Sequence, residues 1–365
     1  MFDFLKKIIE IPTPSYRQDH CYACIQACID YLGHKDFLFI KKHLSNHINS
    51  CLISNTKDSN LDLLFLCHID VVDAPKELFT LREKNNIFYG RGVFDMKGPT
   101  VCVLKALKNY FSKDNHKKIG LLLVSDEEVG GENGTKYWSN ILSPKVVIEP
   151  DSAQPIDKII ESAKQPFFIK LISSGISAHG SRPWLGIDAI QELLTSIQYI
   201  QEKGNFQYYS QNNLPLNQGW VNTMHVGKIQ GGISMNAIAD TAEATLDFRL
   251  IDSKKIDEIK AILENLPSSN VQYEVISQGI LVKTDLSNPI VELYKKITAD
   301  IIGTSLLPSK AFGATDGRYF SHKSILITHQ ASGGDAHGNN EWVSKESLLD
   351  LLKIYHNFLP YFDTL

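Results

Sequence analysis

Three short apolar runs in this chain each lead directly into a group of ionisable side chains. The runs and the groups that follow them are residues 63–67 with His68 and Asp70, residues 119–124 with Asp126, Glu127 and Glu128, and residues 146–148 with Glu149. Each run has the length of a buried strand and falls far short of the ~20 residues that a membrane span requires. Because helix-like segments separate the runs, we expect an α/β sheet covered on both faces, with the ionisable groups at the carboxyl ends of its strands.

The pattern of the chain changes between residues 165 and 278. Strand-like and helix-like segments there follow the order β-α-β-β-α-β, which is the order of a ferredoxin-like unit. The α/β alternation then resumes with a helix from Asn288. We therefore predict a split α/β domain, residues 1–164 and 279–365, whose mixed sheet is flanked by helices, and an inserted ferredoxin-like α+β domain, residues 165–278. Two domains also suit a chain of 365 residues, since one domain usually takes about 150.

The charge balance and the N-terminal residues exclude several classes of protein. Lys and Arg number 37 against 41 Asp and Glu, a formal net charge of −4, so we expect no nucleic-acid partner. Asp3, Pro12 and Pro14 precede any long apolar run. We therefore expect no signal peptide, no membrane partner and a cytoplasmic protein.

The six cysteines include three, Cys21, Cys24 and Cys28, whose spacing admits two interpretations. They could be ligands of a metal or iron–sulfur site, or they could share one buried face of a helix that ends at Gly33. The spacing is helical, and a free thiol packs like a small apolar side chain. We therefore favour the packing interpretation, with reduced cysteines throughout.

His68 and Asp70 are two residues apart at a predicted strand end, so their side chains share a face. Asp70 can then accept the second ring N–H of a metal-bound His68 and fix its tautomer. Further donors are Asp95, between a Gly-rich turn and a helix start, and His337, in the Gly-rich loop 333–338. A mixed set of imidazole and carboxylate ligands suits zinc or a similar divalent ion.

The number of donors in this set is sufficient for two metal ions. Five ligands, one of them a shared carboxylate, would hold two ions about 3.5–4 Å apart. Glu127 and Glu128 are adjacent, and two neighbouring glutamates cannot easily bind the same ion. One of the two is therefore free to act as a general base.

Several linked motifs resemble the signature of one large metallohydrolase family. This family comprises co-catalytic di-zinc deacylases and exopeptidases, among them succinyl-diaminopimelate desuccinylase, acetylornithine deacetylase, aminoacylase and glutamate carboxypeptidase. The resemblance extends over essentially the whole chain and lies in residues 67–72, 90–98, 125–128, 149–150, 177–183, 236, 247–249, 313–319 and 337–341. Several motifs in the right order are a far stronger signal than any one of them.

The resemblance implies a site for two divalent metal ions, which we expect to be zinc, with cobalt or manganese as alternatives. It assigns His68 and Glu149 to one ion and Glu128 and His337 to the other. Asp95 matches the carboxylate that bridges both ions. The resemblance also implies that the α/β domain carries the site and that the inserted domain is a dimerisation (lid) domain.

Three further side chains have roles in this family without binding metal. Asp70 matches the residue that orients His68, and Glu127 matches the general base. In dimeric members a histidine from the neighbouring lid reaches the oxyanion, and His179 matches it, so we expect a homodimer formed through residues 165–278. The alternative is that His179 is only an exposed loop residue.

Four residues match positions that contact the substrate. Asn236 and Arg249 match residues that hold the carboxylate end of the substrate, although Arg249 could instead only cover a sheet face. Gly313 and Thr315 lie in a loop that closely resembles the desuccinylase loop, but Ala314 replaces a hydroxyl residue that would touch the substrate. The sequence therefore does not favour strict desuccinylase activity.

Together these features predict a metal-dependent hydrolase that cleaves the amide bond of a small N-acyl amino acid with a metal-activated water. The alternative among enzymes is a metallo-carboxypeptidase or dipeptidase acting on short peptides, because it needs the same core and differs only in the pocket. The alternative from another class is a metal-bound binding protein without catalysis. The presence of every predicted ligand and of the base argues against that alternative.

Overall fold

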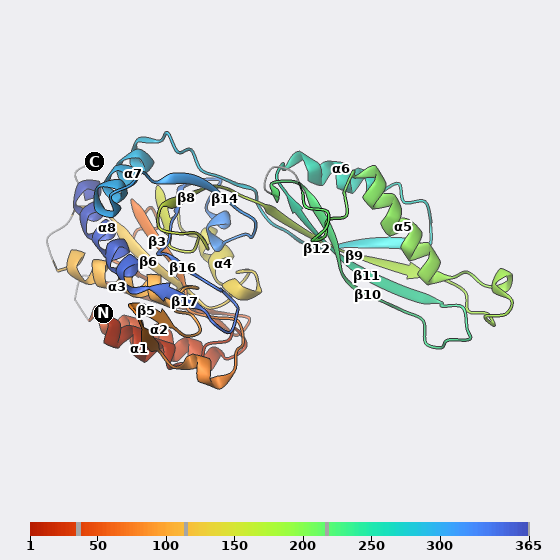
Figure 1. Cartoon of the computed structure of the whole chain (residues 1–365), viewed down its shortest axis with the longest axis horizontal. Helices are drawn as coiled ribbons and strands as arrows, with labels where there is room; N and C mark the ends of the chain where they lie inside the picture. Colours follow the sequence, from red (N-terminus) through yellow and green to blue (C-terminus); the bar gives the residue numbers. More distant parts are fainter. Residues whose placement is uncertain (34–37, 113–115, 216–218, 364–365) are drawn as a thin grey trace. The chain divides into compact units, whose positions relative to one another are not determined.

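The computed structural model describes residues 1–33, 38–112, 116–215 and 219–363 and divides into two compact units (Figure 1). Unit 1 comprises Met1–Ser162, Lys283–Ala311 and Thr315–Leu365, and unit 2 comprises Ala163–Val282 and Phe312–Ala314. The predicted division differs from this one at residues 163–164, 279–282 and 312–314, which group with unit 2. Gly313, which we expected in the α/β domain, therefore belongs to unit 2.

Unit 1 is built around a mixed sheet whose strands lie in the order β1-β2-β6-β3-β7-β15. The bounds are β1 Phe39–Ser45, β2 Ile48–Ser54, β3 Leu63–His68, β6 Ile119–Val124, β7 Val146–Glu149 and β15 Ile325–Thr328. β3 runs parallel to β6 and β7, and β7 runs parallel to β15, whereas β2 is antiparallel to β1 and β6. Every residue of β3 and β6 is buried, which explains why these strands are continuous apolar runs.

Helices bury both faces of this sheet. Phe65 of β3 enters a core that it shares with α1, α2, α3, α7 and α8, while its neighbour Leu64 is buried on the opposite face. On that opposite face Trp138 of α4 donates a hydrogen bond to Ser50 of β2 at 2.8 Å. The helix bounds are α1 Phe2–Ile9, α2 Gln18–Leu32, α3 Lys97–Tyr110, α4 Thr135–Ser139, α7 Pro289–Ile302 and α8 Lys345–Asp363.

The cysteines of α2 belong to this core. Cys21, Cys24 and Cys28 are fully buried and free, so the prediction that they pack as apolar residues is confirmed. Gly33 follows the helix with a φ of 82°, a conformation that favours glycine. None of the described helices combines the length and the apolar character that crossing a bilayer requires.

Short strands complete the molecule. The strands β16-β17-β5-β4 form one antiparallel sheet in this order, and β13-β8-β14 form another sheet. Their bounds are β4 Arg82–Lys84, β5 Ile87–Tyr89, β8 Lys158–Ala163, β13 Val282–Lys283, β14 Leu307–Ala311, β16 Gly333–Gly334 and β17 Trp342–Ser344. The pairing of β5 with β17 joins segments that lie about 250 positions apart and, as shown below, positions two loops of the candidate site.

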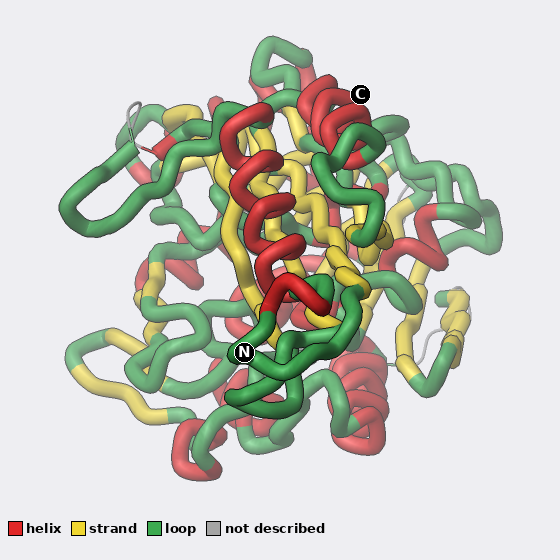
Figure 2. Tube along the Cα trace, turned by 90° about the vertical axis from the view of Figure 1, so that its right-hand side faces the viewer, coloured by secondary structure: helices red, strands yellow, loops and turns green. Residues whose placement is uncertain are grey.

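Unit 2 contains an antiparallel sheet in the order β10-β11-β9-β12. Its elements follow the predicted order and are β9 Gln165–Ser174, α5 Ala189–Lys203, β10 Thr223–Gly231, β11 Thr241–Leu250, α6 Lys254–Leu263 and β12 Val271–Gln278. Buried residues alternate with partly exposed ones along β11, because one face of the sheet packs under α5 (Figure 2). The helix α5 starts after Asp188, whose carboxylate accepts from the backbone N–H of Ile190 at 3.0 Å.

Candidate metal centre

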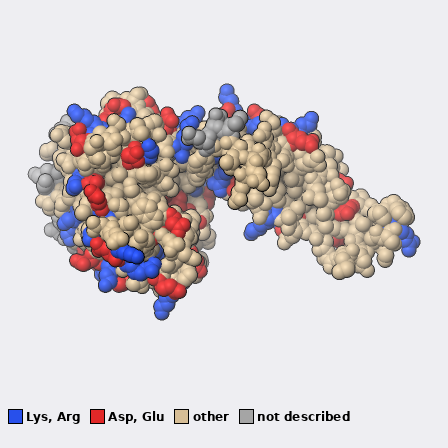
Figure 3. Space-filling view, in the orientation of Figure 1, with Lys and Arg blue, Asp and Glu red and all other residues tan. Residues whose placement is uncertain are grey.

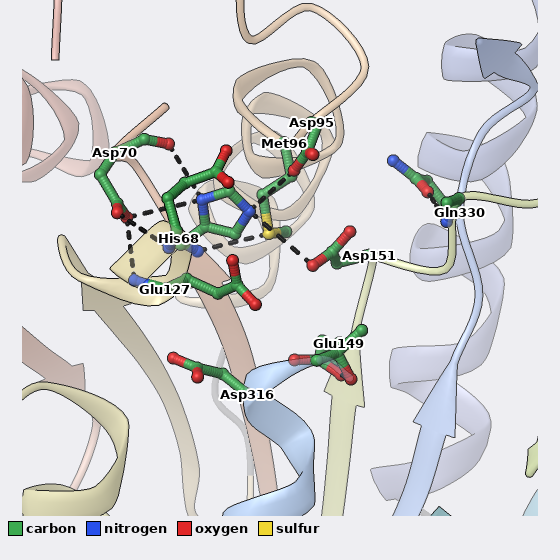
Figure 4. Close-up of polar contacts among 12 residues, drawn as sticks. His68, Asp70, Asp95, Met96, Glu127, Glu149, Asp151, Asp316 and Gln330 are labelled. Carbon is green, nitrogen blue, oxygen red and sulfur yellow. Dashed lines mark hydrogen bonds and ion pairs between the residues drawn. The ribbon is translucent and has the colours of Figure 1, made fainter. Parts of the chain in front are cut away.

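The parallel strands β3, β6 and β7 bring their carboxyl ends to one edge of the sheet of unit 1. β3 ends at His68, β7 ends at Glu149, and the 3-10 turn Glu127–Val129 follows β6. Asp95 lies two residues before the start of α3 at Lys97. The ionisable groups predicted at strand ends thus lie close together (Figure 4).

His68 is buried and has a defined orientation. Its Nδ1 lies 3.0 Å from the backbone oxygen of Asp70 and 3.6 Å from the Asp70 carboxylate, while its Nε2 lies 2.9 Å from Oδ1 of Asp95. The Asp70 carboxylate in turn accepts from the hydroxyl of Ser15 at 2.8 Å. His68 therefore has Nδ1 directed at Asp70 and leaves Nε2 for a ligand on the Asp95 side.

Asp95 faces both predicted histidine ligands. Its Oδ2 lies 3.2 Å from Nε2 of His337, and the same nitrogen lies 3.1 Å from Oε2 of Glu128. One carboxylate oxygen thus serves His68 and the other serves His337. This is the arrangement that a carboxylate shared by two cations needs.

Glu127 and Glu128 both lie near His68 but differ in their other neighbours. One carboxylate oxygen of Glu127 lies within 4.8 Å of ligand atoms of His68 and Asp151. Burial, followed by the negative charges of Asp316 and Asp151, raises the pKa of Glu127 well above its usual value, although His68 opposes the shift. A half-buried carboxylate with a raised pKa has the properties of a general base.

Glu149 makes a different set of contacts from the other predicted ligands. Its Oε1 accepts from the backbone N–H of Gly317 at 2.7 Å, and its Oε2 accepts from the hydroxyl of Thr315 at 2.6 Å. Burial raises its pKa to about 7, against the hydrogen bond from Thr315. Thr315, predicted to touch the substrate, therefore directs its hydroxyl at Glu149.

Asp151 is a member of the cluster that the sequence analysis missed. Its Oδ2 lies 3.8 Å from Nε2 of His68, and the side chain is buried beside Glu127 (Figure 4). The signal was present in the sequence, because Asp151 follows Glu149 and Pro150 directly after β7. The spacing alone could not tell which of the two acids faces His68.

A buried ion pair holds the two loops that carry Asp95 and His337. Glu341 accepts from Nη1 of Arg91 at 2.8 Å and from the backbone N–H groups of Gly92, Phe94 and Asp95 at 3.0, 2.9 and 3.1 Å. Nη2 of Arg91 donates to the backbone oxygen of His337 at 3.0 Å. Both side chains of the ion pair are 2% exposed. They were not among the predicted site residues.

The charges around the two histidines favour a cation. Hydrogen bonds to Asp95 and Glu128 raise the pKa of His337 to about 10. Burial alone would lower the pKa of His68, but hydrogen bonds to Asp70 and Asp95 raise it well above its usual value. In the structure the two imidazoles are thus surrounded by more carboxylates than they can neutralise. A nitrogen of His68 lies within 4.8 Å of carboxylate oxygens of Asp95 and Glu128, and Nε2 of His337 lies 3.2 and 3.1 Å from the same two side chains. Such a set of imidazole and carboxylate donors fits divalent ions such as zinc.

Three of the predicted residues of unit 2, His179, Asn236 and Arg249, lie in two places. His179 is exposed and forms a β-bridge with Ala237, and the backbone N–H of Gly180 donates to the backbone oxygen of Asn236 at 2.8 Å. The structure therefore brings His179 and Asn236 together. Arg249 is eight residues along β11 from Thr241 and forms an ion pair with Asp247 at 2.8 Å. It lies at the other end of that strand.

A mixed α/β unit that gathers two histidines and several carboxylates at the ends of parallel strands belongs to the metal-dependent hydrolases. Comparison with known proteins identifies the family. Residues 64–360 match peptidase family M20/M25/M40, and the chain is a member of this family.

Similar curated proteins carry names from several branches of hydrolases. A probable carboxypeptidase of Aspergillus clavatus is 28% identical over 352 residues, which cover 90% of this chain and 82% of that protein. Human aminoacylase-1 is 26% identical over 70% of this chain and 68% of its own length. The succinyl-diaminopimelate desuccinylase of Wigglesworthia glossinidia brevipalpis is 26% identical over 98% of this chain and 97% of its own.

Solved structures share the fold. An M20 family metallo-carboxypeptidase from Sulfolobus solfataricus superposes with a TM-score of 0.79 at 17% identity and covers 100% of this chain and 99% of its own. A tripeptidase from Staphylococcus aureus superposes with a TM-score of 0.75 at 17% identity, over 100% and 98% of the two chains. The chain is therefore a hydrolase with the mixed α/β fold of this family.

Proposed function

We propose that the chain is a cytoplasmic amidohydrolase that removes the acyl group from a small N-acyl amino acid. It would use two divalent metal ions, which we expect to be zinc. The observation that carries the proposal is the position of Asp95, which offers one oxygen beside His68 and the other beside His337. Glu128 would complete the His337 side, and a carboxylate at the end of β7 or just after it would complete the His68 side. The six cysteines, all free and buried, suit a reducing compartment.

The residues of unit 1 divide the chemistry among them. Ions held there would lower the pKa of a bound water and polarise the amide carbonyl of the substrate. Glu127 would take the proton of the attacking water and pass it to the nitrogen of the leaving amine. Asp70 keeps Nδ1 of His68 engaged, so that Nε2 remains directed at the ligand position.

A panel of N-acetyl and N-succinyl amino acids and of short peptides tests the proposal. The zinc-loaded protein should release free amino acid from at least one N-acyl amino acid, and chelation should abolish this release. Hydrolysis of dipeptides alone would support the second candidate, a metallo-carboxypeptidase or dipeptidase. That candidate is favoured by the carboxypeptidase of Aspergillus clavatus, whose similarity extends over most of both chains. Metal binding without turnover of any member of the panel would contradict both.

We further propose that unit 2 is a lid that dimerises. The edge strand β10 and the turn after it expose Ile229, Ile233 and Met235, and few charged side chains cover this end of unit 2 in the face shown in Figure 3. Exposed apolar side chains on an edge strand suit isologous pairing with a second copy. In such a dimer His179 and Asn236 of one subunit would complete the site of the other.

A further inference from the structure

Two buried acids follow β7, and they face different parts of unit 1. Glu149 is the last residue of the strand, and Asp151 follows it after Pro150. Only Asp151 belongs, with His68 and Glu127, to a group whose ligand atoms lie within 4.8 Å of one another. Its Oδ2 lies 3.8 Å from Nε2 of His68, the nitrogen that also faces Asp95.

The carboxylate of Glu149 accepts hydrogen bonds from the turn that follows β14. Its two oxygens accept from Gly317 and Thr315 at 2.7 and 2.6 Å, and the hydroxyl of Thr328 lies 3.5 Å from Oε2. A Cβ at Gly317 would lie 2.5 Å from Oε2 of Glu149, so the carboxylate lies directly against this backbone. In Figure 4 it lies toward Asp316 and away from His68.

The turn that carries Asp151 is held beside Asp95 by a buried amide. Oε1 of Gln330 accepts from the backbone N–H groups of Ser152 and Ala153 at 2.9 and 2.8 Å. Nε2 of the same side chain donates to the backbone oxygen of Phe94 at 2.6 Å, the residue before Asp95. Gln330 thus fixes the position of Asp151 relative to the carboxylate that both histidines face.

The surroundings of the Asp151 carboxylate are those expected for a side chain that binds a metal ion. Within the described part of the chain it receives no hydrogen bond, and it forms an ion pair with His68 at 3.8 Å. A buried carboxylate without donors is costly unless a cation neutralises it. A metal ion on Nε2 of His68 would supply that charge.

We propose that Asp151, and not Glu149, is the carboxylate that completes the His68 side of the metal centre. Glu149 instead holds the turn of residues 315–317. This inference rests on the proposed two-metal hydrolase and changes the ligand set that the family resemblance implied.

Two isosteric variants, Asp151→Asn and Glu149→Gln, distinguish the alternatives. Metal content is measured by elemental analysis after dialysis, and affinity is measured by titration with Co(II), followed by its absorption spectrum. Asp151→Asn should retain one ion at wild-type affinity and bind the other at least about tenfold more weakly, a lower limit taken from the loss of outer-shell partners. Glu149→Gln should retain both ions and lower the midpoint of thermal unfolding, because it weakens the contacts to Gly317 and Thr315.

The opposite pattern, loss of an ion in Glu149→Gln and two tightly bound ions in Asp151→Asn, would overturn the inference. If Asp151→Asn does not fold, Asp151→Glu takes its place, since it keeps the charge and moves the oxygens. It should bind two ions with a changed Co(II) spectrum, and an unchanged spectrum would contradict the ligand role. Failure of the proposed function gives a separate result, because the wild-type protein would then bind no ions or hydrolyse no member of the panel.

Discussion

The backbone N–H groups of Glu127 and Glu128 both donate to Asp70, at 3.3 and 3.2 Å. This contact fixes the 3-10 turn after β6, so that the two adjacent glutamates point to different partners. Glu128 lies 3.1 Å from His337 and groups with His68 and Asp95, whereas Glu127 groups with His68 and Asp151. A single aspartate therefore contacts the predicted histidine ligand and holds the turn that carries the predicted glutamate ligand and the predicted base.

Glu127→Gln tests this assignment of base and ligand. It removes the base while leaving the ligands, so turnover should fall by roughly 10²–10⁴-fold with the metal content unchanged. The matched control is Glu77→Gln, the same chemical change at an exposed residue, which should leave both quantities at wild-type values. A loss of metal from Glu127→Gln would mean that base and ligand are assigned to the wrong glutamates.

His329 makes stability depend on pH. It is fully buried, Tyr294 Oη lies 2.8 Å from its Nδ1, and its Nε2 lies 2.6 Å from the backbone oxygen of Ile156. Burial lowers its pKa to about 4 from the 6.5 of an exposed histidine. The neutral ring is favoured in the folded state, so its contribution is complete above the unfolded pKa and is lost as the pH falls toward 4.

The free energy of unfolding in urea, measured at pH 7 and pH 5 for wild type and His329→Gln, isolates this effect. The advantage of wild type over the variant should shrink by about 2 kcal/mol between the two pH values. The variant is needed because burial raises the pKa of Asp126 to about 7. Protonation of Asp126 therefore stabilises the folded state as the pH falls from 7 to 5, which opposes the effect of His329 in the wild type. An advantage that does not change with pH would show that His329 does not titrate as a buried neutral ring.

At the scale of elements, the pairing of β5 with β17 brings together the loops that carry Asp95 and His337. Trp342 lies opposite Tyr89 in this pair, so Glu341, just before β17, comes to Arg91, just after β5. The resulting ion pair and its backbone contacts hold the loop of Asp95 and the loop of His337 together. The geometry of the centre is thus built into the register of a short antiparallel pair.

Glu341→Gln tests this positioning role. It leaves Arg91 buried without its counter-charge, which should cost about 3 kcal/mol in the free energy of unfolding. It should also weaken binding of the ion beside His337 by about 10–100-fold, as expected for an outer-shell partner, with a changed Co(II) spectrum. The control is Glu83→Gln, which breaks the exposed ion pair with Lys345 and should cost no more than about 1 kcal/mol. A stable Glu341→Gln protein with normal metal affinity would contradict the positioning role.

The secondary-structure elements also explain which site residues could be predicted from the sequence and which could not. β3 and β6 are apolar throughout because both of their faces are buried, so the positions of His68 and Glu128 after them followed from local pattern. Asp151 did not follow, because Gln330, 178 positions away, fixes the turn that carries it. Arg91 and Glu341 were missed for the same reason, since their contact spans 250 positions. Strand ends are local features, whereas the orientation of a side chain in a loop depends on distant contacts.

At the scale of the whole molecule, the two groups of predicted substrate residues in unit 2 are too far apart for one small substrate. Asn236 precedes β11 and lies with His179, whereas Arg249 is eight residues beyond Thr241 along the strand. Eight residues of strand span about 27 Å, several times the length of an N-acyl amino acid. If both groups touch one substrate, they must come from two subunits.

Mixed dimers of two inactive variants test this arrangement. A His179→Ala subunit keeps its own Glu127, and a Glu127→Ala subunit supplies an intact His179 to its neighbour. After subunit exchange of equal amounts, half of the dimers are mixed and one of their two sites is complete, so roughly a quarter of wild-type activity should return. Arg249→Ala mixed with Glu127→Ala is the control, because Arg249 would serve the site of its own chain and no activity should return. Recovery in neither mixture despite demonstrated exchange, or a fully active monomer in sedimentation, would rule out the role of His179 in the neighbouring site.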